Sequence, residues 1–273
     1  MVGGIVLAGG RSSRMGAAKA SLEWHGSTLL RRVAGLVERS VAGPIVIVRS
    51  AGQRLPSLPA AYEVVDDVHD GRGPLEGLAA GLRALAGRAE LAYVSSTDVP
   101  FLHSSFVGAV VGGLGDRDQI CVPVVGRRLQ PLAAAYRTSL TAELDELLAA
   151  DERRVGRLFD RCRVNRLDPD DLLGNAAVAA WDPGLESVVN LNDPQAYAAA
   201  RARPAPEVAV GWEGRDRGAD GRARVVRAAT LGGAADALGV GLDGRVTVNG
   251  NEADADRELP LEQGDAVAFL RPT

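Results

Sequence analysis

Short apolar runs alternate with stretches of helical periodicity along the first half of the chain, and this alternation admits few folds. The apolar runs have the length of strands and are largely apolar on both faces, as in strands that are covered on both sides. They are Gly4–Ala8, Pro44–Val48, Glu63–Val65, Leu91–Ser95 and Ile120–Val124. The helical stretches, most with Ser or Pro near the start, are Ser27–Ser40, Pro74–Ala86, Ser104–Leu114 and Ser139–Ala149. The alternation predicts a Rossmann-like α/β fold with a mostly parallel sheet in three layers.

Length and composition set further bounds. The chain has 273 residues, enough for one large domain or two ordinary ones, with 46% hydrophobic and 24% charged residues. Its net charge of −4 gives no electrostatic case for a polyanion such as DNA as the main partner. The start, MVGGIVLAGG, has neither a basic region nor a long apolar run, so we expect no signal peptide or membrane anchor and a cytoplasmic location. Cys121 and Cys162 lack metal-site spacing and are expected to be buried free thiols.

The pattern changes at residues 201–207, RARPAPE, which is polar and contains two prolines. This segment predicts a linker, crossed by few contacts, between a domain of residues 1–200 and one of residues 208–273. The second part predicts a hairpin, one helix and further short strands, which together indicate a small α+β domain of β-grasp (ubiquitin-like) type. These elements are Val208–Trp212, Arg222–Ala228, Leu231–Leu238, Val246–Val248, Glu258–Leu261 and Ala266–Leu270, with GRDRGADG as the hairpin turn.

The loop after the first strand carries the strongest chemical pattern. It reads LAGGRSSRMGAAK, in which Gly9 and Gly10 allow backbone amides to approach a phosphate or a base edge closely. Arg14 and Lys19 add positive charge, and Lys19 is the only lysine among 31 basic residues. A compact ammonium is not interchangeable with a guanidinium where one phosphate oxygen must be reached. We therefore predict a phosphate-binding loop that is neither a Walker A loop nor a GxGxxG loop.

Acidic residues follow two other predicted strands, at the edge of the sheet where ligands of such folds bind. Asp98 lies in TDVPFL, directly after a strand, where its carboxylate could hold Mg²⁺ that bridges phosphates. The alternative is that Asp98 caps the next turn. Asp66 and Asp67 end the third strand, and one of them is expected to contact the ligand unless both merely form a polar strand end.

Two later groups could bind a second substrate. Asn190 and Asn192, in VVNLND, would share one side of a short strand, and their amides could recognise a base or a pterin; turn formation is the alternative. Arg127, Arg128 and Gln130 could receive an anionic substrate or be solvated. The histidines share no spacing and indicate surface or capping roles.

Taken together, these motifs resemble the molybdenum cofactor guanylyltransferase family over roughly Gly4 to Ala200. The resemblance is carried by LAGGRSSRMGAAK, VVDD and GPLEG, TDVPFL, GRRLQPLAAAY, ERRV and VNLNDP, in this order. It implies that Leu7, Ala8 and Gly9 contact guanine and ribose and that Arg14 and Lys19 hold phosphates. It further implies that Asp67 contacts the nucleotide, that Asp98 binds nucleotide and Mg²⁺, and that Asn190 and Asn192 lie on the molybdopterin side. Arg49 departs from the family, which often has Asn at this position.

The implied reaction transfers GMP from GTP to the molybdenum-molybdopterin cofactor and releases pyrophosphate. Such chemistry needs positioning and charge neutralisation more than a covalent catalyst, with Lys19, Arg14 and Asp98 in these roles. The last part of the chain is similar to the sulfur-carrier β-grasp family, through LGGAADALGV, RVTVNG and LPLEQGDAVAFLRP. Members of that family end in Gly-Gly, whereas this sequence ends in Arg271-Pro272-Thr273, so we expect a docking or structural role, with proteins of cofactor biosynthesis as candidate partners.

Three other functions remain open on the sequence alone. The same class of enzyme could use CTP, although LAGG favours guanine. A sugar-phosphate nucleotidyltransferase is disfavoured because a dedicated sugar domain is missing. A non-catalytic scaffold that delivers the cofactor is disfavoured by the presence of both Lys19 and Asp98.

Overall fold

The structure is a computed structural model and describes residues 1–9, 18–67, 73–213, 223–242 and 244–270. The first and larger part contains a central sheet, a small hairpin, α-helices and short 3₁₀ helices (η). Its elements are β1 (Val2–Leu7), η1 (Lys19–Ser21), β2 (Glu23–Trp24), β3 (Ser27–Thr28), α1 (Leu29–Ser40), β4 (Ile45–Ser50), β5 (Glu63–Asp67), α2 (Pro74–Leu85), β6 (Leu91–Ser96), α3 (Ser104–Gly112), β7 (Ile120–Val125), β8 (Arg128–Leu129), β9 (Ala133–Arg137), η2 (Thr138–Leu140), α4 (Thr141–Ala149), η3 (Val155–Asp160), β10 (Val164–Leu167), α5 (Pro169–Leu173), α6 (Ala176–Trp181), η4 (Glu186–Val188) and α7 (Pro194–Arg201).

The central sheet has the strand order β10-β7-β9-β6-β1-β4-β5, with β8 paired to β7. β1 lies between β4 and β6 and is parallel to both, so the carboxyl ends of these strands meet at one edge. The predicted α/β class with a mostly parallel sheet is confirmed, and the predicted strands and helices end within a few residues of the observed ones. The sequence pattern missed β9, which is antiparallel to its neighbours β6 and β7.

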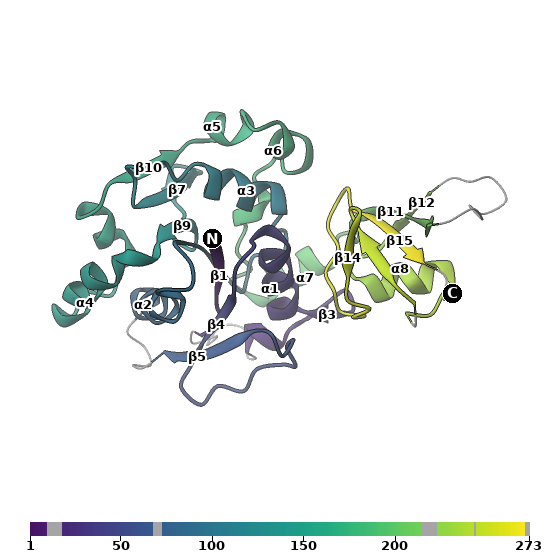
Figure 1. The fold of residues 1–273 in the computed structure, drawn as a ribbon, viewed down its shortest axis with the longest axis horizontal. Helices are drawn as coiled ribbons and strands as arrows, with labels where there is room; N and C mark the ends of the chain where they lie inside the picture. Colours follow the sequence, from purple (N-terminus) through teal and green to yellow (C-terminus); the bar gives the residue numbers. More distant parts are fainter. Residues whose placement is uncertain (10–17, 68–72, 214–222, 243, 271–273) are drawn as a thin grey trace.

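Helices cover both faces of the central sheet, and successive residues of β1 explain why. Val6 packs with α1 and α3 on one face, whereas Ile5 and Leu7 pack with α2 and α4 on the other. Figure 1 shows α1 and α2 on opposite sides of β1 and β4. α2 approaches the sheet so closely that a Cβ atom at Gly81 would lie 2.6 Å from the side chain of Ile5. Strands that are buried on both faces require the largely apolar runs seen in the sequence.

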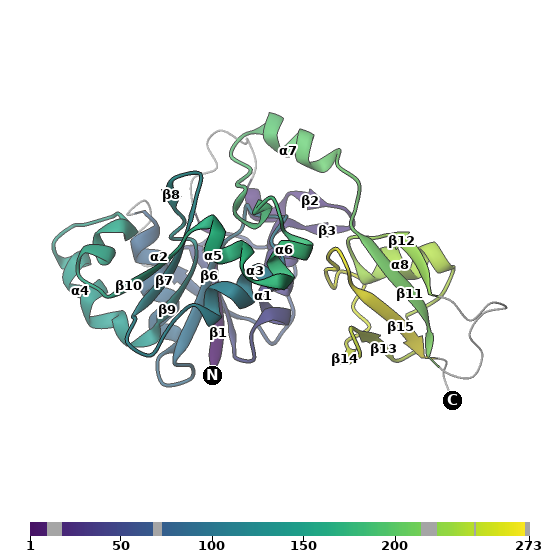
Figure 2. The ribbon, with the colours of Figure 1, turned by 90° about the horizontal axis from the view of Figure 1, so that it is seen from above.

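The second part of the chain forms its own sheet beside α1 (Figures 1 and 2). Its elements are β11 (Glu207–Glu213), β12 (Arg224–Arg227), α8 (Leu231–Leu238), β13 (Val246–Val248), β14 (Asn251–Ala253) and β15 (Ala266–Leu270). The order is β12-β11-β15-β13-β14, with β11 and β15 parallel at the centre. Apolar side chains of α8 pack with those of β11, β13 and β15 in a separate core.

Two expectations for this second part were wrong in detail. Glu258–Leu261 is not a strand, although Pro260 forms an isolated bridge with Thr230. β14 was not predicted, since its residues Asn251–Ala253 are mostly polar and lie at the edge of the sheet. The predicted turn GRDRGADG lies outside the described residues.

The segment between the two parts is short, but contacts across the boundary are many. α7 ends at Arg201 and β11 begins at Glu207, close to the expected linker. Arg31, Arg32 and Arg39 of α1 all donate hydrogen bonds to residues of the second part. The expectation that few contacts cross this boundary was therefore wrong.

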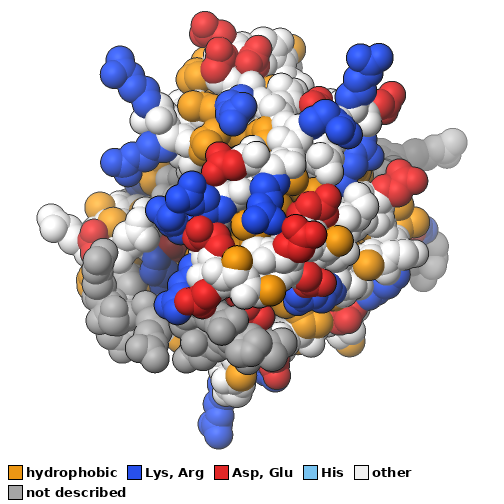
Figure 3. All heavy atoms as spheres, turned by 90° about the vertical axis from the view of Figure 1, so that its left-hand side faces the viewer, with side chains coloured by type: hydrophobic (Ala, Val, Ile, Leu, Met, Phe, Trp, Pro, Cys, Tyr) orange, Lys and Arg blue, Asp and Glu red, His pale blue; other side chains and the backbone are white. Residues whose placement is uncertain are grey.

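Charges of both signs share the surface near α4. Figure 3 shows basic and acidic side chains intermixed on this face, and the ion pairs Arg161–Glu146 and Arg157–Asp160 lie on or near α4 and η3. The described residues of this face therefore form no extended basic patch for a polyanion. Among the helices of the described residues, none combines the length and the apolar character needed to cross a membrane.

Candidate active site

A cavity of about 630 Å³ opens at the carboxyl edge of the central sheet. Parallel strands end there, and ligands of open α/β sheets bind at this edge. Most residues predicted to form the site line this one cavity, although they lie far apart in the sequence. These residues are Leu7, Ala8, Gly9, Lys19, Asp67, Asp98, Asn190 and Asn192. Gly10 and Arg14 were also predicted to belong to the site, and both lie outside the described residues.

Two of the three residues to which we assigned the chemistry, Lys19 and Asp98, contact each other directly. Lys19 begins η1, and its Nζ lies 2.6 Å from Oδ2 of Asp98 and 3.2 Å from Oδ1 of Asn192. The side chains of Lys19 and Asp98 are 22% and 13% exposed, so the ion pair is partly shielded but still reaches the cavity. One cation, one carboxylate and one amide thus meet where β1 and β6 end.

Asp98 is held in place by groups on both sides of it. Its Oδ1 accepts a hydrogen bond of 2.7 Å from Ser96 Oγ, and its backbone oxygen accepts one of 2.9 Å from the Leu191 amide. The neighbouring Thr97 donates through Oγ1 to the Leu7 carbonyl at 2.9 Å. Hydrogen bonds therefore connect the loop with Asp98 both to the end of β1 and to the segment that carries the two asparagines.

The short strand predicted around Asn190 and Asn192 is absent, because residues 189–193 lie outside any helix or ladder. Leu191 is buried at 2% exposure, while the asparagines on either side of it line the cavity. Asn190 accepts from Ser96 Oγ at 3.4 Å and donates to the Val188 carbonyl. The i and i+2 relation thus places both amides on one side even without strand pairing.

The backbone at Leu7–Gly9 is already engaged in hydrogen bonds. The amides of Ala8 and Gly9 both donate to the Val48 carbonyl, at 2.7 and 3.2 Å. The Ala8 carbonyl accepts from Gln53 Nε2 at 3.0 Å, and Gln53 Oε1 accepts from the Ser50 amide. No sequence pattern indicates Gln53, because a single glutamine in a loop has no characteristic spacing.

The pair Asp66 and Asp67 divides between two environments. Asp67 lines the cavity, whereas Asp66 accepts from Arg49 Nε at 2.6 Å on the surface. Arg49 also donates to the Gln53 carbonyl and does not line the cavity. Arg49, where the sequence differs from the family pattern, thus forms contacts beside the cavity and not within it.

α2 also begins at the cavity. Gly73 precedes the helix with φ +83°, and Pro74 is its first residue. Both residues line the cavity. The amides at the start of a helix favour an anion because they have no carbonyl partners within the helix. The start of α2 therefore presents to the cavity a helix end that favours an anion, although Pro74 itself has no N–H.

Arg127, Arg128 and Gln130 belong to the hairpin of β7 and β8 and do not line the cavity. The two arginines are exposed, and Arg127 has φ +63° in the turn. β7 is parallel to β6 through their shared neighbour β9, so the hairpin rises from the same edge of the sheet as the cavity. His103 caps α3 by accepting from the Ser105 amide.

Known proteins match the sequence and the fold of the first part of the chain. The family model described as the MobA-like NTP transferase domain matches residues 4–166, more than half of the chain. The chain belongs to the MobA-like NTP transferase family. The match ends before the second sheet begins.

Relatives agree with this assignment, and a solved structure has a similar fold. A probable molybdenum cofactor guanylyltransferase of Mycobacterium bovis is 37% identical over 168 residues, which cover 60% of this chain and 82% of the relative. One of Bacillus cytotoxicus is 29% identical over 199 residues, which cover 72% of this chain and 94% of the relative. The crystal structure of molybdopterin-guanine dinucleotide biosynthesis protein A from Archaeoglobus fulgidus aligns with a TM-score of 0.59 and 23% identity, covering 73% of this chain and 96% of that one. The chain is thus a nucleotidyltransferase of this family.

Proposed function

We propose that this protein transfers GMP from GTP to the molybdenum-molybdopterin cofactor and releases pyrophosphate. The observation that supports this most is the contact of Lys19 with both Asp98 and Asn192. It joins the residues assigned to the triphosphate with one assigned to the molybdopterin side. Relatives described as probable molybdenum cofactor guanylyltransferases support the choice of substrates.

The nucleotide would lie across the end of β1, with its phosphates at Lys19 and the start of α2. Because an ammonium donates as a point charge, we expect Lys19 to exchange its present contacts for phosphate oxygens when GTP binds. The Ala8 carbonyl has a second lone pair beside the one that Gln53 occupies. This carbonyl could accept from the N1–H or amino group of guanine, so base recognition would rest on carbonyls more than on the engaged amides.

The residues of the cavity fit a divalent cation such as Mg²⁺. The described residues contain no group of three or more His, Cys, Asp or Glu side chains that could hold a metal ion. Mg²⁺ at nucleotide sites is commonly held by one or two carboxylates, with phosphate oxygens and waters completing its shell. Asp98, with one oxygen fixed by Ser96, would hold the ion, which would supply charge neutralisation to the phosphates.

The second substrate would approach from the side of Asn190 and Asn192. Their amides lie at hydrogen-bond distance from Ser96 and Lys19, so a group bound there is adjacent to the phosphate site. Arg127 and Arg128, on the hairpin beyond the same edge, are proposed to attract the anionic cofactor before it enters. Asp67 would contact the nucleotide from the opposite side of the cavity.

The chemical step forms one bond and breaks one bond. An oxygen of the cofactor's terminal phosphate attacks the α-phosphorus of GTP, and the bond from this phosphorus to the bridging oxygen of the β-phosphate breaks. Pyrophosphate leaves with that electron pair, and GMP becomes linked to the cofactor as a dinucleotide. Lys19 would stabilise the charge that develops on the phosphates, and Asp98 would keep Lys19 oriented before the nucleotide enters.

Pyrophosphate release tests the proposal. The enzyme is incubated with molybdenum-molybdopterin, Mg²⁺ and each of the four nucleoside triphosphates in turn. We expect release with GTP well above that with CTP, ATP and UTP, and none without the cofactor. Equal or faster release with CTP would favour a cytidylyltransferase, and no release with any nucleotide would favour a delivery scaffold.

For the second domain we propose a β-grasp fold. The sheet order β12-β11-β15-β13-β14 supports it, because β11 and β15, the first and last strands of this domain along the chain, are parallel neighbours at the centre. One helix packs against the sheet, as this fold requires. Of the two roles expected for this domain, the contacts with α1 favour a structural one. Docking of another protein of cofactor biosynthesis would use the side turned away from α1, where Val225 of β12 is 68% exposed.

A further inference from the structure

A buried arginine connects the loop with Asp98 to the second domain. Arg32 of α1 is 6% exposed, and its Nε donates to the Pro100 carbonyl at 2.6 Å. Its Nη1 donates to the carbonyls of Ala229 and Leu261, at 3.3 and 3.1 Å, both in the second domain. Burial lowers the pKa of this guanidinium to about 10, so it remains charged at neutral pH. Pro100 lies two residues after Asp98, so one side chain spans the distance from the active-site loop to the second domain.

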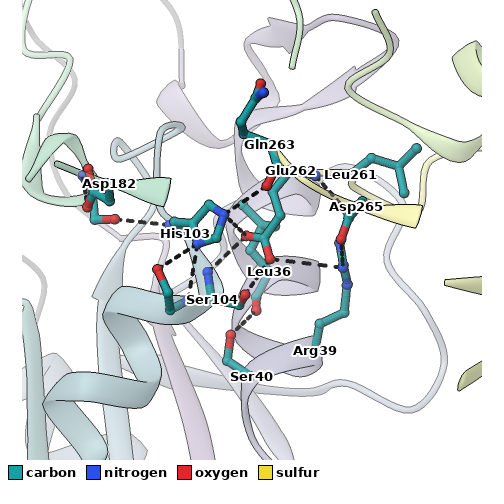
Figure 4. Close-up of polar contacts among 12 residues, drawn as sticks. Leu36, Arg39, Ser40, His103, Ser104, Asp182, Leu261, Glu262, Gln263 and Asp265 are labelled. Atoms are coloured by element: carbon teal, nitrogen blue, oxygen red, sulfur yellow. Dashed lines mark hydrogen bonds and ion pairs between the residues drawn. The ribbon is translucent and has the colours of Figure 1, made fainter. Parts of the chain in front are cut away.

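A second connection lies at the far end of the same loop. α3 begins at Ser104, whose amide donates to Glu262 Oε2 at 2.8 Å and whose hydroxyl donates to Glu262 Oε1. Next to it, Nε2 of His103 lies 3.1 Å from the Gln263 carbonyl. Figure 4 shows His103 and Ser104 facing Glu262 and Gln263 across the boundary. A residue of the second domain thus satisfies a helix-terminal amide that α3 leaves unpaired.

These connections belong to a tightly packed boundary. Arg39 of α1 donates to both carboxylate oxygens of Asp265, at 2.6 and 2.8 Å (Figure 4). Burial lowers the pKa of Arg39, but the hydrogen bonds with Asp265 and the negative charges of Asp265 and Glu262 together hold the pKa above its usual value. A Cβ atom at Gly35 would lie 2.6 Å from Pro260, so α1 and the second domain touch without a gap. Contacts of this kind do not fit a freely tethered domain.

The second domain also contacts the segment that follows Lys19. Ser27 Oγ, in β3, donates to Glu258 Oε2 at 3.2 Å, and Gly26 lies against the side chain of Thr230. β2 and β3 follow η1, which begins with Lys19. The second domain therefore contacts the chain close to both residues of the ion pair without lining the cavity.

We infer that the second domain is a fixed part of the catalytic unit that holds the Asp98 loop in place, with Arg32 and Glu262 as positioning residues. The inference rests on the proposed function only where it assigns Asp98 to the reaction with GTP. Loss of either contact leaves buried carbonyls or a helix-terminal amide without a partner, and the loop can then shift. Misplacement of a reacting group by about 1 Å can lower turnover by about 10²-fold.

The test uses full-length variants of the positioning residues and a matched control. Arg32→Met and Glu262→Ala remove the two contacts, whereas Glu262→Gln keeps an oxygen that can accept from Ser104. Arg227→Ala is the control, since it breaks an exposed ion pair with Glu207 in the same domain and removes no hydrogen bond of Arg32 or Glu262. Hydrogen exchange of the amides in residues 98–104 is measured together with kcat and KM for GTP.

We expect faster exchange at residues 98–104 and a kcat lowered by about tenfold or more in Arg32→Met and Glu262→Ala, with little change in KM for GTP. Glu262→Gln should restore most of the activity, and Arg227→Ala should behave like the wild type. If Arg32→Met does not fold, the comparison of Glu262→Ala with Glu262→Gln decides. Folded variants with unchanged exchange and unchanged kcat would overturn the inference. A wild type without activity on GTP would refute the proposed function instead, and the exchange data would still judge the inference.

Discussion

Replacing Asp98 by Asn removes one negative charge from the cavity and changes the shape of the side chain very little. In the wild type, Oδ2 of Asp98 lies 2.6 Å from Lys19 Nζ, and Oδ1 accepts from Ser96 at 2.7 Å. A hydrogen bond to a charged group contributes about 1.5–3 kcal/mol and a neutral one about 1 kcal/mol, so the contact with Lys19 in the free enzyme loses roughly 0.5–2 kcal/mol. Lys19 exchanges this contact for phosphate oxygens when GTP binds, so its loss affects the orientation of Lys19 before binding and not the chemical step. The charge lost at the metal and phosphates brings the expected loss in kcat to about 10²–10³.

The assay is steady-state release of pyrophosphate, with GTP affinity measured separately by calorimetry. Asp98→Asn should bind GTP nearly as well as the wild type but turn it over far more slowly at any Mg²⁺ concentration. Asp66→Asn is the control, because Asp66 also ends a strand beside the site but pairs with Arg49 and does not line the cavity. Near-normal turnover by Asp98→Asn, or an equal loss in Asp66→Asn, would refute the assignment of Asp98.

Three further changes test other parts of the account. Lys19→Ala should weaken GTP binding by about 1.5–3 kcal/mol in calorimetry, and Lys19→Arg should restore little of it, because a planar fork replaces a point donor; full affinity in Lys19→Arg would contradict this. Gln53→Ala should raise KM for GTP by roughly fivefold, about 1 kcal/mol for one hydrogen bond, and should reduce discrimination against CTP, because the Ala8 carbonyl loses its hydrogen bond from Gln53. An unchanged KM would show that Gln53 is not needed. Alkylation at mildly alkaline pH should modify half-buried Cys162 first and should leave Cys121 unmodified until the protein unfolds, because burial raises the pKa of Cys121 to about 12. Equal alkylation rates of the two cysteines in the folded enzyme would contradict this.

The placement of Lys19, Asp67 and Asp98 followed from the sequence because topology brings distant loops together. Each residue lies at or shortly after the end of a run that pairs in parallel with its neighbours, so all three come to one edge of the sheet. Asn190 and Asn192 reached the same cavity for a different reason than expected. They alternate around buried Leu191 in an extended segment, and the strand predicted for them does not form.

The contacts between the two domains could not be predicted in the same way. Arginine side chains are ordinarily exposed, so the sequence does not predict that Arg32 is buried between the domains. Its partners are backbone carbonyls, which have no sequence signature. Prolines and polar residues at 201–207 predicted a linker, but they describe the connecting chain and not the surfaces on either side. Gln53 was missed for a related reason, since its partners Ala8 and Ser50 are backbone groups.

The proposed transfer of GMP is tested most directly by following the two ends of the triphosphate. The wild-type enzyme is incubated with molybdenum-molybdopterin, Mg²⁺ and GTP labelled with ³²P at either the α- or the γ-phosphate. We predict that the α-label moves into a guanine dinucleotide of the cofactor, while the γ-label appears only in pyrophosphate. A γ-label that appears in inorganic phosphate or on the cofactor, or an α-label that stays in free nucleotide, would contradict it.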